Sequence, residues 1–297
     1  MSVDIAFVTV NYNTLEHLQR LTAFFNRLDA PFTFSFTVVD NSSCDGSQEF
    51  LQAHPEIQYL QTTENIGYGR GINRAVAATS SKYICVTNTD VILNRESLVI
   101  LWRFLEERHD VGVCAPRIIY ADGRDQGMLF HHSLFSHYAT WYAKALARYA
   151  KSKIANATAP LKVDGVTGAF FLIRRRSIVP LPALFDEDFF FYHEDTALAH
   201  MLKNRGVACF VIPHATITHL GGQSSSPSSV SLFYKSKYLY LRKFYGPLHA
   251  KAIRFLDRLR VLRKLLFYSL LSLLVGSERI KSKQRYYKLA WSTAFPR

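Results

Sequence analysis

Short apolar runs alternate with amphipathic stretches over the first 115 residues. Five runs are apolar and β-branched enough to predict buried strands: residues 5–10, 34–39, 57–62, 84–87 and 111–115. Between them apolar residues recur at helical spacing, as in Leu15, Leu18, Leu21 and Phe25 after a capping Thr14. This alternation predicts an α/β fold with a mainly parallel central sheet and helices on both faces.

Each of the first four predicted strands ends in polar side chains. These are Asn11 and Asn13, Asp40 and Asn41, Asn65, and Asn88 and Asp90. The carboxyl ends of parallel strands share one edge of a sheet, where open α/β folds bind ligands. Asp90 would offer half a site for a hard divalent cation. Asn and Asp also close strands as turn residues, and both interpretations of the segment 88–90 stay open.

Three glycines alternate in Gly67-Tyr68-Gly69-Arg70-Gly71 before a helix expected at 72–78. The spacing departs from the dinucleotide fingerprint, and the segment follows the third strand rather than the first. We expect a loop whose glycines let the backbone approach a ligand, with Arg70 as a cation. A plain flexible turn is the alternative.

The alternation stops after residue 115. Residues 116–163 form an aromatic, His-rich insertion, in which the spacing of His131, His132 and His137 matches no common zinc site. It is expected either to line an acceptor site or to pack its aromatic side chains inward. A strand at 164–173, a helix at 196–205 and a strand at 208–212 follow.

Glu194 and Asp195 stand at the first turn of the predicted helix. The helix dipole favours acidic residues there, which is one explanation of the pair. The dipole should also lower the pKa of a carboxyl group, so that an ionised carboxylate in an aromatic-walled cleft can accept a proton from a bound hydroxyl. Downstream, His219 precedes Gly221-Gly222; a single His is more often structural, but this one would complete a manganese or magnesium shell with Asp90.

Basic residues are concentrated at the carboxyl end. The net charge is +13, yet residues 235–297 hold 16 of the 36 Lys and Arg and only 2 of the 23 Asp and Glu. From Ala252 to Leu273 apolar residues mark one face of a helix, and the uncharged run 265–275 is shorter than the ~20 residues that span a bilayer. An interfacial helix on anionic lipid is expected; docking on the catalytic body or a homodimer seam are the alternatives. No nucleic-acid-binding module is recognisable.

The four cysteines stand far apart, and Cys85, Cys114 and Cys209 lie in apolar runs. They predict buried thiols in a reducing compartment. Residues 2–4 carry no basic segment typical of a secretory signal. The expected location is cytoplasmic, peripheral on the inner face of the cytoplasmic membrane.

Seven segments together resemble the family-two glycosyltransferases of GT-A fold that build bacterial cell-surface glycans. They are VNYN (10–13), VVDNSSCDGS (38–47), NIGYGRGIN (65–73), TNTDV (87–91), DGVTGAFFLIRR (164–175), FDEDFFFYHEDTALAHMLKNRG (185–206) and HLGGQS (219–224). Their order is the family's order. The resemblance implies a Rossmann-like nucleotide-diphospho-sugar transferase in residues 1–228, divided into a donor half (1–115) and an acceptor half (116–228). A helical, basic, amphipathic extension (229–297) would follow.

The resemblance also implies roles for individual residues. Asp195 would be the catalytic base, with Glu194 beside it; Asp90 and His219 would hold Mn²⁺ or Mg²⁺. Asn88 replaces the first carboxylate of the DxD-type motif. The implied nucleotide-sugar contacts are Val10, Asn11, Tyr12, Asn13, Asp40 (to the base), Asn41, Ser42, Asn65, Gly67, Arg70, Asn73, Asn88, Thr89 and Asp90. The implied acceptor contacts are Gly168, Tyr192 and Glu194.

The implied reaction is an inverting transfer from a nucleotide-diphospho-sugar to a hydroxyl of a lipid-linked or polysaccharide acceptor. Segments 164–175 and 185–195 most resemble rhamnosyltransferases that use dTDP-rhamnose. Alternatives are a UDP-hexose or UDP-N-acetylhexosamine donor, or a non-catalytic nucleotide-sugar-binding scaffold at the membrane. A nucleotidyltransferase would want a glycine-rich basic loop after the first strand, where Asn11-Tyr12-Asn13 stands.

Overall fold

The computed structural model describes residues 3–127, 134–179, 181, 183–221, 227–275 and 277–295. The chain divides into two compact units. The first comprises the described residues of 1–132, 141–190 and 194–221; the second comprises those of 133–140, 191–193 and 222–297. None of the described helices is long and apolar enough to cross a membrane.

The first unit is built on one mixed sheet. Its strands are β1 (Val3–Asn11), β2 (Phe34–Asp40), β3 (Gln58–Gln61), β4 (Ser81–Thr87), β5 (Val91–Ile92), β6 (Val111–Tyr120), β7 (Leu161–Val163), β8 (Phe170–Arg174) and β9 (Ala208–His219). The order across the sheet is β3-β2-β1-β4-β8-β6-β9-β5, with β7 also paired to β9. Strands β3, β2, β1, β4, β6 and β9 point the same way, while β8, β7 and β5 run against them. The expected mainly parallel sheet is confirmed.

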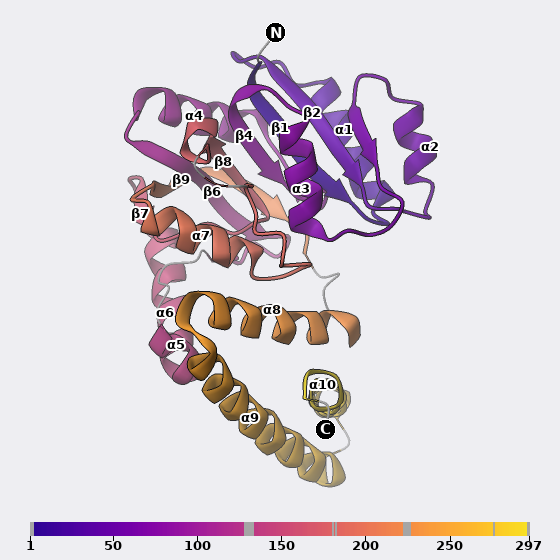
Figure 1. Cartoon of the computed structure of the whole chain (residues 1–297), viewed down its shortest axis with the longest axis vertical. Helices are drawn as coiled ribbons and strands as arrows, with labels where there is room; N and C mark the ends of the chain where they lie inside the picture. The colour runs from indigo at the N-terminus through magenta and orange to yellow at the C-terminus, as the bar shows by residue number, and fades with distance from the viewer. Residues whose placement is uncertain are drawn as a thin grey trace. The chain divides into compact units, whose positions relative to one another are not determined.

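Helices cover both faces of this sheet (Figure 1). They are α1 (Leu15–Asn26), α2 (Ser47–Gln52), α3 (Tyr68–Ala77), α4 (Arg95–Glu107), α6 (Thr140–Ala155) and α7 (Glu194–Asn204). Alternate strand residues point to opposite faces, so Phe7 packs with the apolar stripes of α1 and α4, while its neighbour Val8 packs with those of α3, α6 and α7. Two cores on the two faces of one sheet are therefore the source of this unit's stability.

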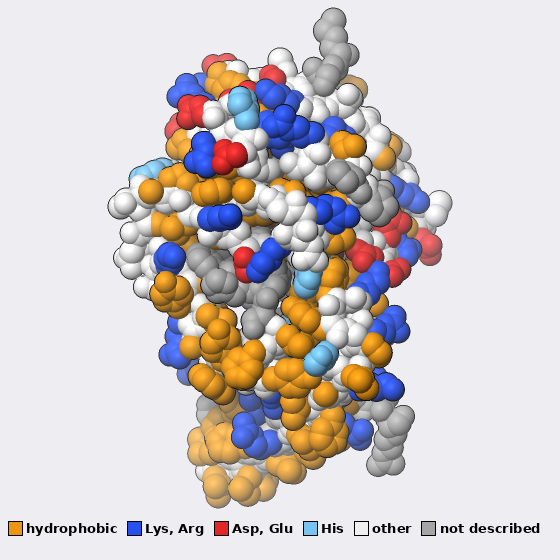
Figure 2. All heavy atoms as spheres, turned by 60° about the vertical axis from the view of Figure 1, so that its left-hand side comes forward, with side chains coloured by type: hydrophobic (Ala, Val, Ile, Leu, Met, Phe, Trp, Pro, Cys, Tyr) orange, Lys and Arg blue, Asp and Glu red, His pale blue; other side chains and the backbone are white. Residues whose placement is uncertain are grey.

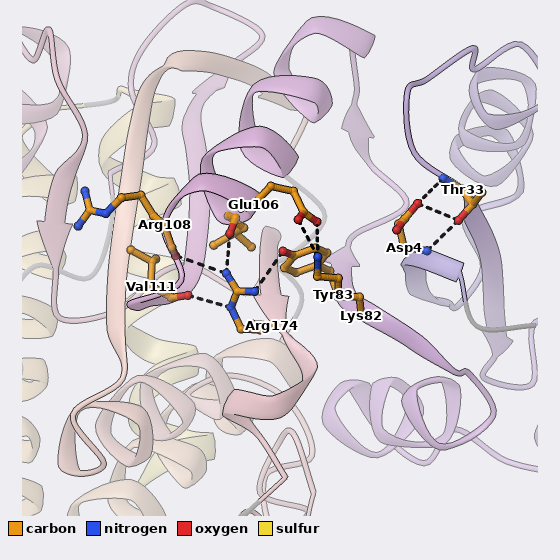
Figure 3. Close-up of polar contacts among 9 residues, drawn as sticks. Asp4, Thr33, Lys82, Tyr83, Glu106, Arg108, Val111 and Arg174 are labelled. Atoms are coloured by element: carbon orange, nitrogen blue, oxygen red, sulfur yellow. Dashed lines mark hydrogen bonds and ion pairs between the residues drawn. The ribbon is translucent and has the colours of Figure 1, made fainter.

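A buried arginine joins three elements at the amino end of β4 (Figure 3). The guanidinium of Arg174 donates to the carbonyl oxygens of Val111 and Leu105 and, through Nη1, to the hydroxyl of Tyr83 at 3.1 Å. Its side chain also lies against the Tyr83 ring. A buried cation held mainly by carbonyl dipoles has a structural role, because no carboxylate is among its bonded partners.

Several sequence expectations about elements are wrong, among them the strand expected at 208–212, which continues to His219 as β9. The strand expected at 111–115 continues to Tyr120, because β9 pairs along its whole length. Of the strand expected at 164–173, only the last part is β8 (Phe170–Arg174); residues 164–169, with a turn at Gly168, connect it to β7, which ends at Val163. Thr14 does not cap α1 with its side chain; the Leu15 N–H donates instead to Asp45 Oδ2, 2.9 Å away, in the loop after β2. The expected burial of Cys85, Cys114 and Cys209 is confirmed.

The second unit contains a hairpin of long helices. Its described helices are α5 (Leu134–Tyr138), α8 (Pro227–Tyr245), α9 (Pro247–Leu274) and α10 (Glu278–Ala294). Helix α9 packs through Ala250, Ile253, Asp257 and Val261. Asp257 is 5% exposed and accepts hydrogen bonds from Lys237 Nζ (2.5 Å), the Tyr238 hydroxyl (3.2 Å) and Arg260 (3.0 Å). This paired carboxylate ties α8 to α9.

The apolar face predicted for the tail exists and stays largely exposed. Phe255, Leu259, Leu266, Leu270 and Leu273 of α9 are between 47% and 83% exposed. Figure 2 shows apolar side chains, with Lys and Arg among them, gathered at the lower end of the view, where Figure 1 places α9. The single helix expected from residue 252 is in fact longer, and it packs on α8 and α10 through its opposite side.

Candidate active site

The polar strand ends meet at one edge of the sheet, as expected. The register of β1 and β2 sets Asn11 opposite Asp40, and Asn11 Nδ2 donates to Asp40 Oδ1 at 2.7 Å. The hydroxyls of Thr14 and Thr89 lie 2.9 Å apart and join the end of β1 to the turn after β4. Residues separated by up to 75 positions therefore form one polar edge.

Asp40 is the centre of this edge and is fully buried. Its Oδ1 accepts from Asn11 Nδ2 and from Ser43 Oγ (2.6 Å), and its Oδ2 accepts from the Ser43 N–H (3.0 Å) and Gln61 Nε2 (2.8 Å). The carboxylate thus holds the loop after β2 in shape. Sequence reasoning missed Ser43 and Gln61, whose contacts depend on the fold of that loop.

Two amide oxygens at the same edge are buried without a partner. Asn41 Nδ2 donates to Asn65 Oδ1 and to the Gly67 carbonyl oxygen, but Asn41 Oδ1 has no hydrogen-bond partner in the described part of the chain. The same is true of Asn88 Oδ1. Buried polar atoms are nearly always paired, so these two oxygens are candidates for contact with a ligand.

The turns that end β1 and β2 contain left-handed residues other than glycine. Asn13 has φ 53° and Ser42 has φ 64°. Asn13 Oδ1 accepts from the Cys44 N–H at 2.8 Å, which locks one turn onto the other, and the preceding Tyr12 is half-exposed. Backbone strain of this kind persists only where the surroundings fix it, and it is concentrated at ligand sites.

The glycine segment is not the loop that the sequence predicted. Gly67 (φ 89°) precedes α3, and Gly69 and Gly71 lie in its first turn. A Cβ at Gly71 would stand 2.6 Å from Val10 Cγ2, and one at Gly69 would stand 3.1 Å from Phe185 Cβ. These glycines therefore allow close packing within the protein.

Two other implied donor contacts hold the segment 185–187. Buried Asn73 donates to the Phe185 carbonyl oxygen (2.8 Å) and Glu187 Oε1 (3.1 Å) and accepts from the Phe185 N–H. Arg70 Nε donates to the Glu187 carbonyl oxygen at 2.9 Å. Both side chains thus position the chain that leads toward α7.

Asp90 and His219 face each other across a short antiparallel pair. The β5–β9 register sets Val91 opposite His219, and His219 Nε2 lies 3.1 Å from Asp90 Oδ1. On the other side of the ring, Nδ1 lies 2.7 Å from Gln126 Oε1, a residue that sequence reasoning missed. Partial burial works to raise the pKa of Asp90, yet the hydrogen bond and charge of His219 outweigh it and hold that pKa below its usual value.

This couple fits a divalent cation. An amide oxygen only accepts, so Gln126 fixes the proton on Nδ1 and turns Nε2 toward Asp90; metal-bound imidazoles are commonly oriented in this way. A carboxylate oxygen and an imidazole nitrogen are donors that Mn²⁺ accepts. The described residues contain no group of three or more His, Cys, Asp or Glu that could hold a metal. The remaining ligands would have to come from substrate or water.

Glu194 and Asp195 open α7, as predicted, in different surroundings. Glu194 is 7% exposed, and its Oε2 has no partner within the described residues. Asp195 is partly exposed; its Oδ1 accepts from the Thr196 N–H (2.6 Å) and its Oδ2 from the Gly168 N–H (3.1 Å). Only Asp195 combines access to solvent with donors that stabilise its anion.

The expectation that the helix dipole leaves a carboxyl group here with a lowered pKa is wrong. Burial first, and the neighbouring Asp195 second, raise the pKa of Glu194 to about 8. Burial also raises the pKa of Asp195, against the lowering effect of its hydrogen bonds from Gly168 and Thr196. Burial thus disfavours the charge on both carboxyl groups, while the donors from Gly168 and Thr196 favour the anion of Asp195, and a carboxylate with a raised pKa is a stronger base.

Tyr68 lies between the Glu194–Asp195 pair and Asp90, and it was not predicted as a site residue. Its hydroxyl donates to the Gly168 carbonyl oxygen at 2.9 Å, so Tyr68 and Asp195 bind opposite sides of the same turn. Burial first, then the negative charges of Glu194, Asp195 and Asp90, raise the pKa of this hydroxyl well above its usual value. All three carboxyl groups thus lie around one tyrosine.

The chain enters α7 through Tyr192 and His193, which both have left-handed backbone, with φ 68° and 65°. These two residues belong to the second unit, where His193 stacks on Tyr240. The expected acceptor contact Tyr192 stands there, against Phe233. Two consecutive left-handed residues thus stand immediately before the carboxylate pair, and backbone strain of this kind is concentrated at functional sites.

Residues 6–179, more than half of the chain, match the family model described as glycosyl transferase family 2. The chain belongs to glycosyltransferase family 2. The N-acetylglucosaminyl-diphospho-decaprenol L-rhamnosyltransferase of Mycobacterium tuberculosis is 25% identical to this transferase. The match covers 81% of this transferase and 85% of the relative. The abequosyltransferase of Salmonella typhimurium is 26% identical over 37% of the transferase and 35% of the relative.

The structure of a mannosyltransferase from Pyrobaculum calidifontis, in complex with GDP-Man and Mn²⁺, has a similar fold. The superposition covers 100% of this chain and 88% of the mannosyltransferase chain, with a TM-score of 0.59 and 13% identity. The expected GT-A fold with a mainly parallel sheet and carboxyl-terminal helices is confirmed.

Proposed function

We propose that this transferase moves L-rhamnose from dTDP-rhamnose to a hydroxyl of a lipid-linked or polysaccharide acceptor, with inversion, during cell-surface glycan assembly. The observation that carries the catalytic part is the Glu194–Asp195 pair, in which Glu194 is buried with its pKa raised to about 8, and Asp195 is partly exposed with two backbone N–H donors on its carboxylate. The donor and acceptor classes are supported by the Mycobacterium relative, of which the transferase covers 85%.

Asp195 is the proposed base. It accepts the proton of the acceptor hydroxyl, whose oxygen then bonds to the anomeric carbon as the bond from that carbon to the nucleotide diphosphate breaks. The N–H groups of Gly168 and Thr196 hold the carboxylate in place, and Tyr68 fixes the Gly168 turn. The proton held by Glu194 keeps a second negative charge away from the attacking oxygen.

Asp90 and His219 would hold a divalent cation, which when bound neutralises charge on the departing diphosphate. The edge formed by Asn11, Asp40, Asn41 and Asn88 is the proposed donor site. Asp40 already accepts four hydrogen bonds from the protein. For it to accept one from the nucleotide base of the donor, a protein donor must move away, and the candidate is Gln61, which is exposed at the end of β3.

We propose further that the exposed apolar face of α9 rests on an anionic membrane surface. A strip of Leu and Phe beside many Lys and Arg is the composition of interfacial helices. The transferase would then act as a peripheral protein on the inner face of the cytoplasmic membrane, beside a lipid-linked acceptor.

A donor panel tests the assignment. The full chain with Mn²⁺ is incubated with dTDP-rhamnose, UDP-glucose, UDP-N-acetylglucosamine and GDP-mannose, and thermal stabilisation and slow donor hydrolysis are measured. We expect the largest stabilisation and the fastest hydrolysis with dTDP-rhamnose. A preference for a UDP-sugar would replace the donor assignment, and no response to any donor would favour a scaffold.

A further inference from the structure

A basic cavity lies within the second unit, away from the carboxylate pair in sequence. It has a volume of about 480 Å³ and is lined by α8, the first two turns of α9 and the last turn of α10. Four cations line it: Lys235 and Arg242 from α8, and Lys251 and Arg254 from α9. No carboxylate is among its lining residues.

These four side chains differ from other cations of the same helices. Lys237 and Arg260 are paired with Asp257, and Lys264 donates to the Tyr287 hydroxyl. By contrast, the side chains of Lys235, Arg242, Lys251 and Arg254 form no hydrogen bond or ion pair with any described residue; Arg254 only lies over the Tyr238 ring, 5.7 Å from its centroid. Four like charges facing one cavity repel each other, and a bound anion would relieve that repulsion.

We propose that this cavity binds a phosphate group carried by a lipid at the membrane surface. Phosphate oxygens suit the arginine fork and the lysine ammonium group, and the long α9 begins at the cavity with the positive end of its dipole. On the same helix, Lys251 precedes exposed Phe255 and Leu259 by one and two turns, so the cations flank the apolar face. A phosphate site of this kind deepens the proposed function, because a lipid-linked acceptor carries such a phosphate. The phosphate site rests on the proposed function only for the identity of the lipid.

The experiment uses the full chain and needs neither donor nor turnover. Co-sedimentation is measured with vesicles of phosphatidylcholine alone and with added phosphatidic acid, for the wild type and for Arg242→Gln/Arg254→Gln. The matched control is Arg279→Gln/Lys283→Gln, which removes two exposed cations of α10 and leaves the cavity intact. Thermal melts with inorganic pyrophosphate complete the set.

We expect the cavity pair to weaken vesicle binding by about tenfold more than the control pair. Pyrophosphate should stabilise the wild type and the control but not the cavity variant, and should compete with vesicles. Equal losses for the two pairs would show that only diffuse charge matters and would overturn the site. Pyrophosphate binding without a vesicle effect would overturn the lipid as its source. The donor panel is independent of these outcomes, so the two proposals fail separately.

Discussion

Two carboxyl groups of the first unit have opposite surroundings. At the ends of β1 and β2, Asp40 accepts four hydrogen bonds from the protein. At the start of α7, Glu194 is buried with an oxygen that no described residue satisfies, and burial raises its pKa. The carboxylate of Asp40 is fully satisfied by folding. The carboxyl group of Glu194 is left incomplete, which is what a site looks like when its remaining partners arrive with the substrate.

The largest effect that tests this contrast is on turnover. Asp195→Asn removes the proposed base while it keeps the size of the side chain, so transfer should fall by about 10²–10⁴-fold. Donor-induced thermal stabilisation should persist, because the donor edge is untouched. Glu49→Gln, an exposed change on α2, is the matched control. Undiminished transfer by the Asn variant would remove Asp195 from the mechanism.

The reverse effect is expected at Asp40. Asp40→Ala removes a buried carboxylate that accepts four hydrogen bonds, one of them from buried Asn11, so the free energy of unfolding should drop by about 2–4 kcal/mol. Asp195→Asn should change it by less than about 1 kcal/mol, since its native carboxylate is already disfavoured by burial. Urea unfolding of both variants gives the comparison. If both lose similar stability, the two regions do not differ as proposed.

The pH dependence of stability follows from Glu194. Its pKa rises from an ordinary 4.5 to about 8 on folding, so the folded chain holds a proton that the unfolded chain has released. Stability from this group is complete below about pH 4.5 and is lost as the pH rises to about 8, by up to about 1.4 kcal/mol per pH unit. Glu194→Gln lacks this loss. The difference in melting temperature between the variant and the wild type should therefore widen from pH 5 to pH 8, and a constant difference would contradict the assignment.

The sequence predicted the framework because its signals are local. Apolar runs such as residues 5–10 and the polar residues that end them are visible one strand at a time, and they placed Asn11, Asp40 and Asp90 at one edge. The Gly67–Gly71 segment belongs largely to α3 rather than to the expected loop. Glycine permits close approach of any neighbour, and Gly71 and Gly69 pack closely against Val10 and Phe185, while a ligand contact at Gly67 and Arg70 stays a prediction.

What the sequence could not predict depends on contacts between distant residues. Tyr68 lies 100 positions from the Gly168 carbonyl that it binds, and the antiparallel β8 that brings them together was expected as part of a longer strand. The pKa direction of Glu194 was also out of reach, because burial by the rest of the fold overcomes the local dipole.

The smallest expected effect concerns Asp90 and His219, the proposed metal ligands, because a protein side chain orients the imidazole of His219. Gln126 Oε1 holds His219 Nδ1 at 2.7 Å and thereby aims Nε2 at Asp90. Gln126→Leu removes this acceptor, so the Mn²⁺ concentration that half-saturates the protein should rise about 10–100-fold. Gln126→Glu keeps an acceptor oxygen at the same reach and should restore most of the affinity. Manganese titrations followed by thermal shift, without donor, measure both variants. If Gln126→Leu binds Mn²⁺ as the wild type does, His219 is not a ligand, and its contact with Asp90 is only an ion pair.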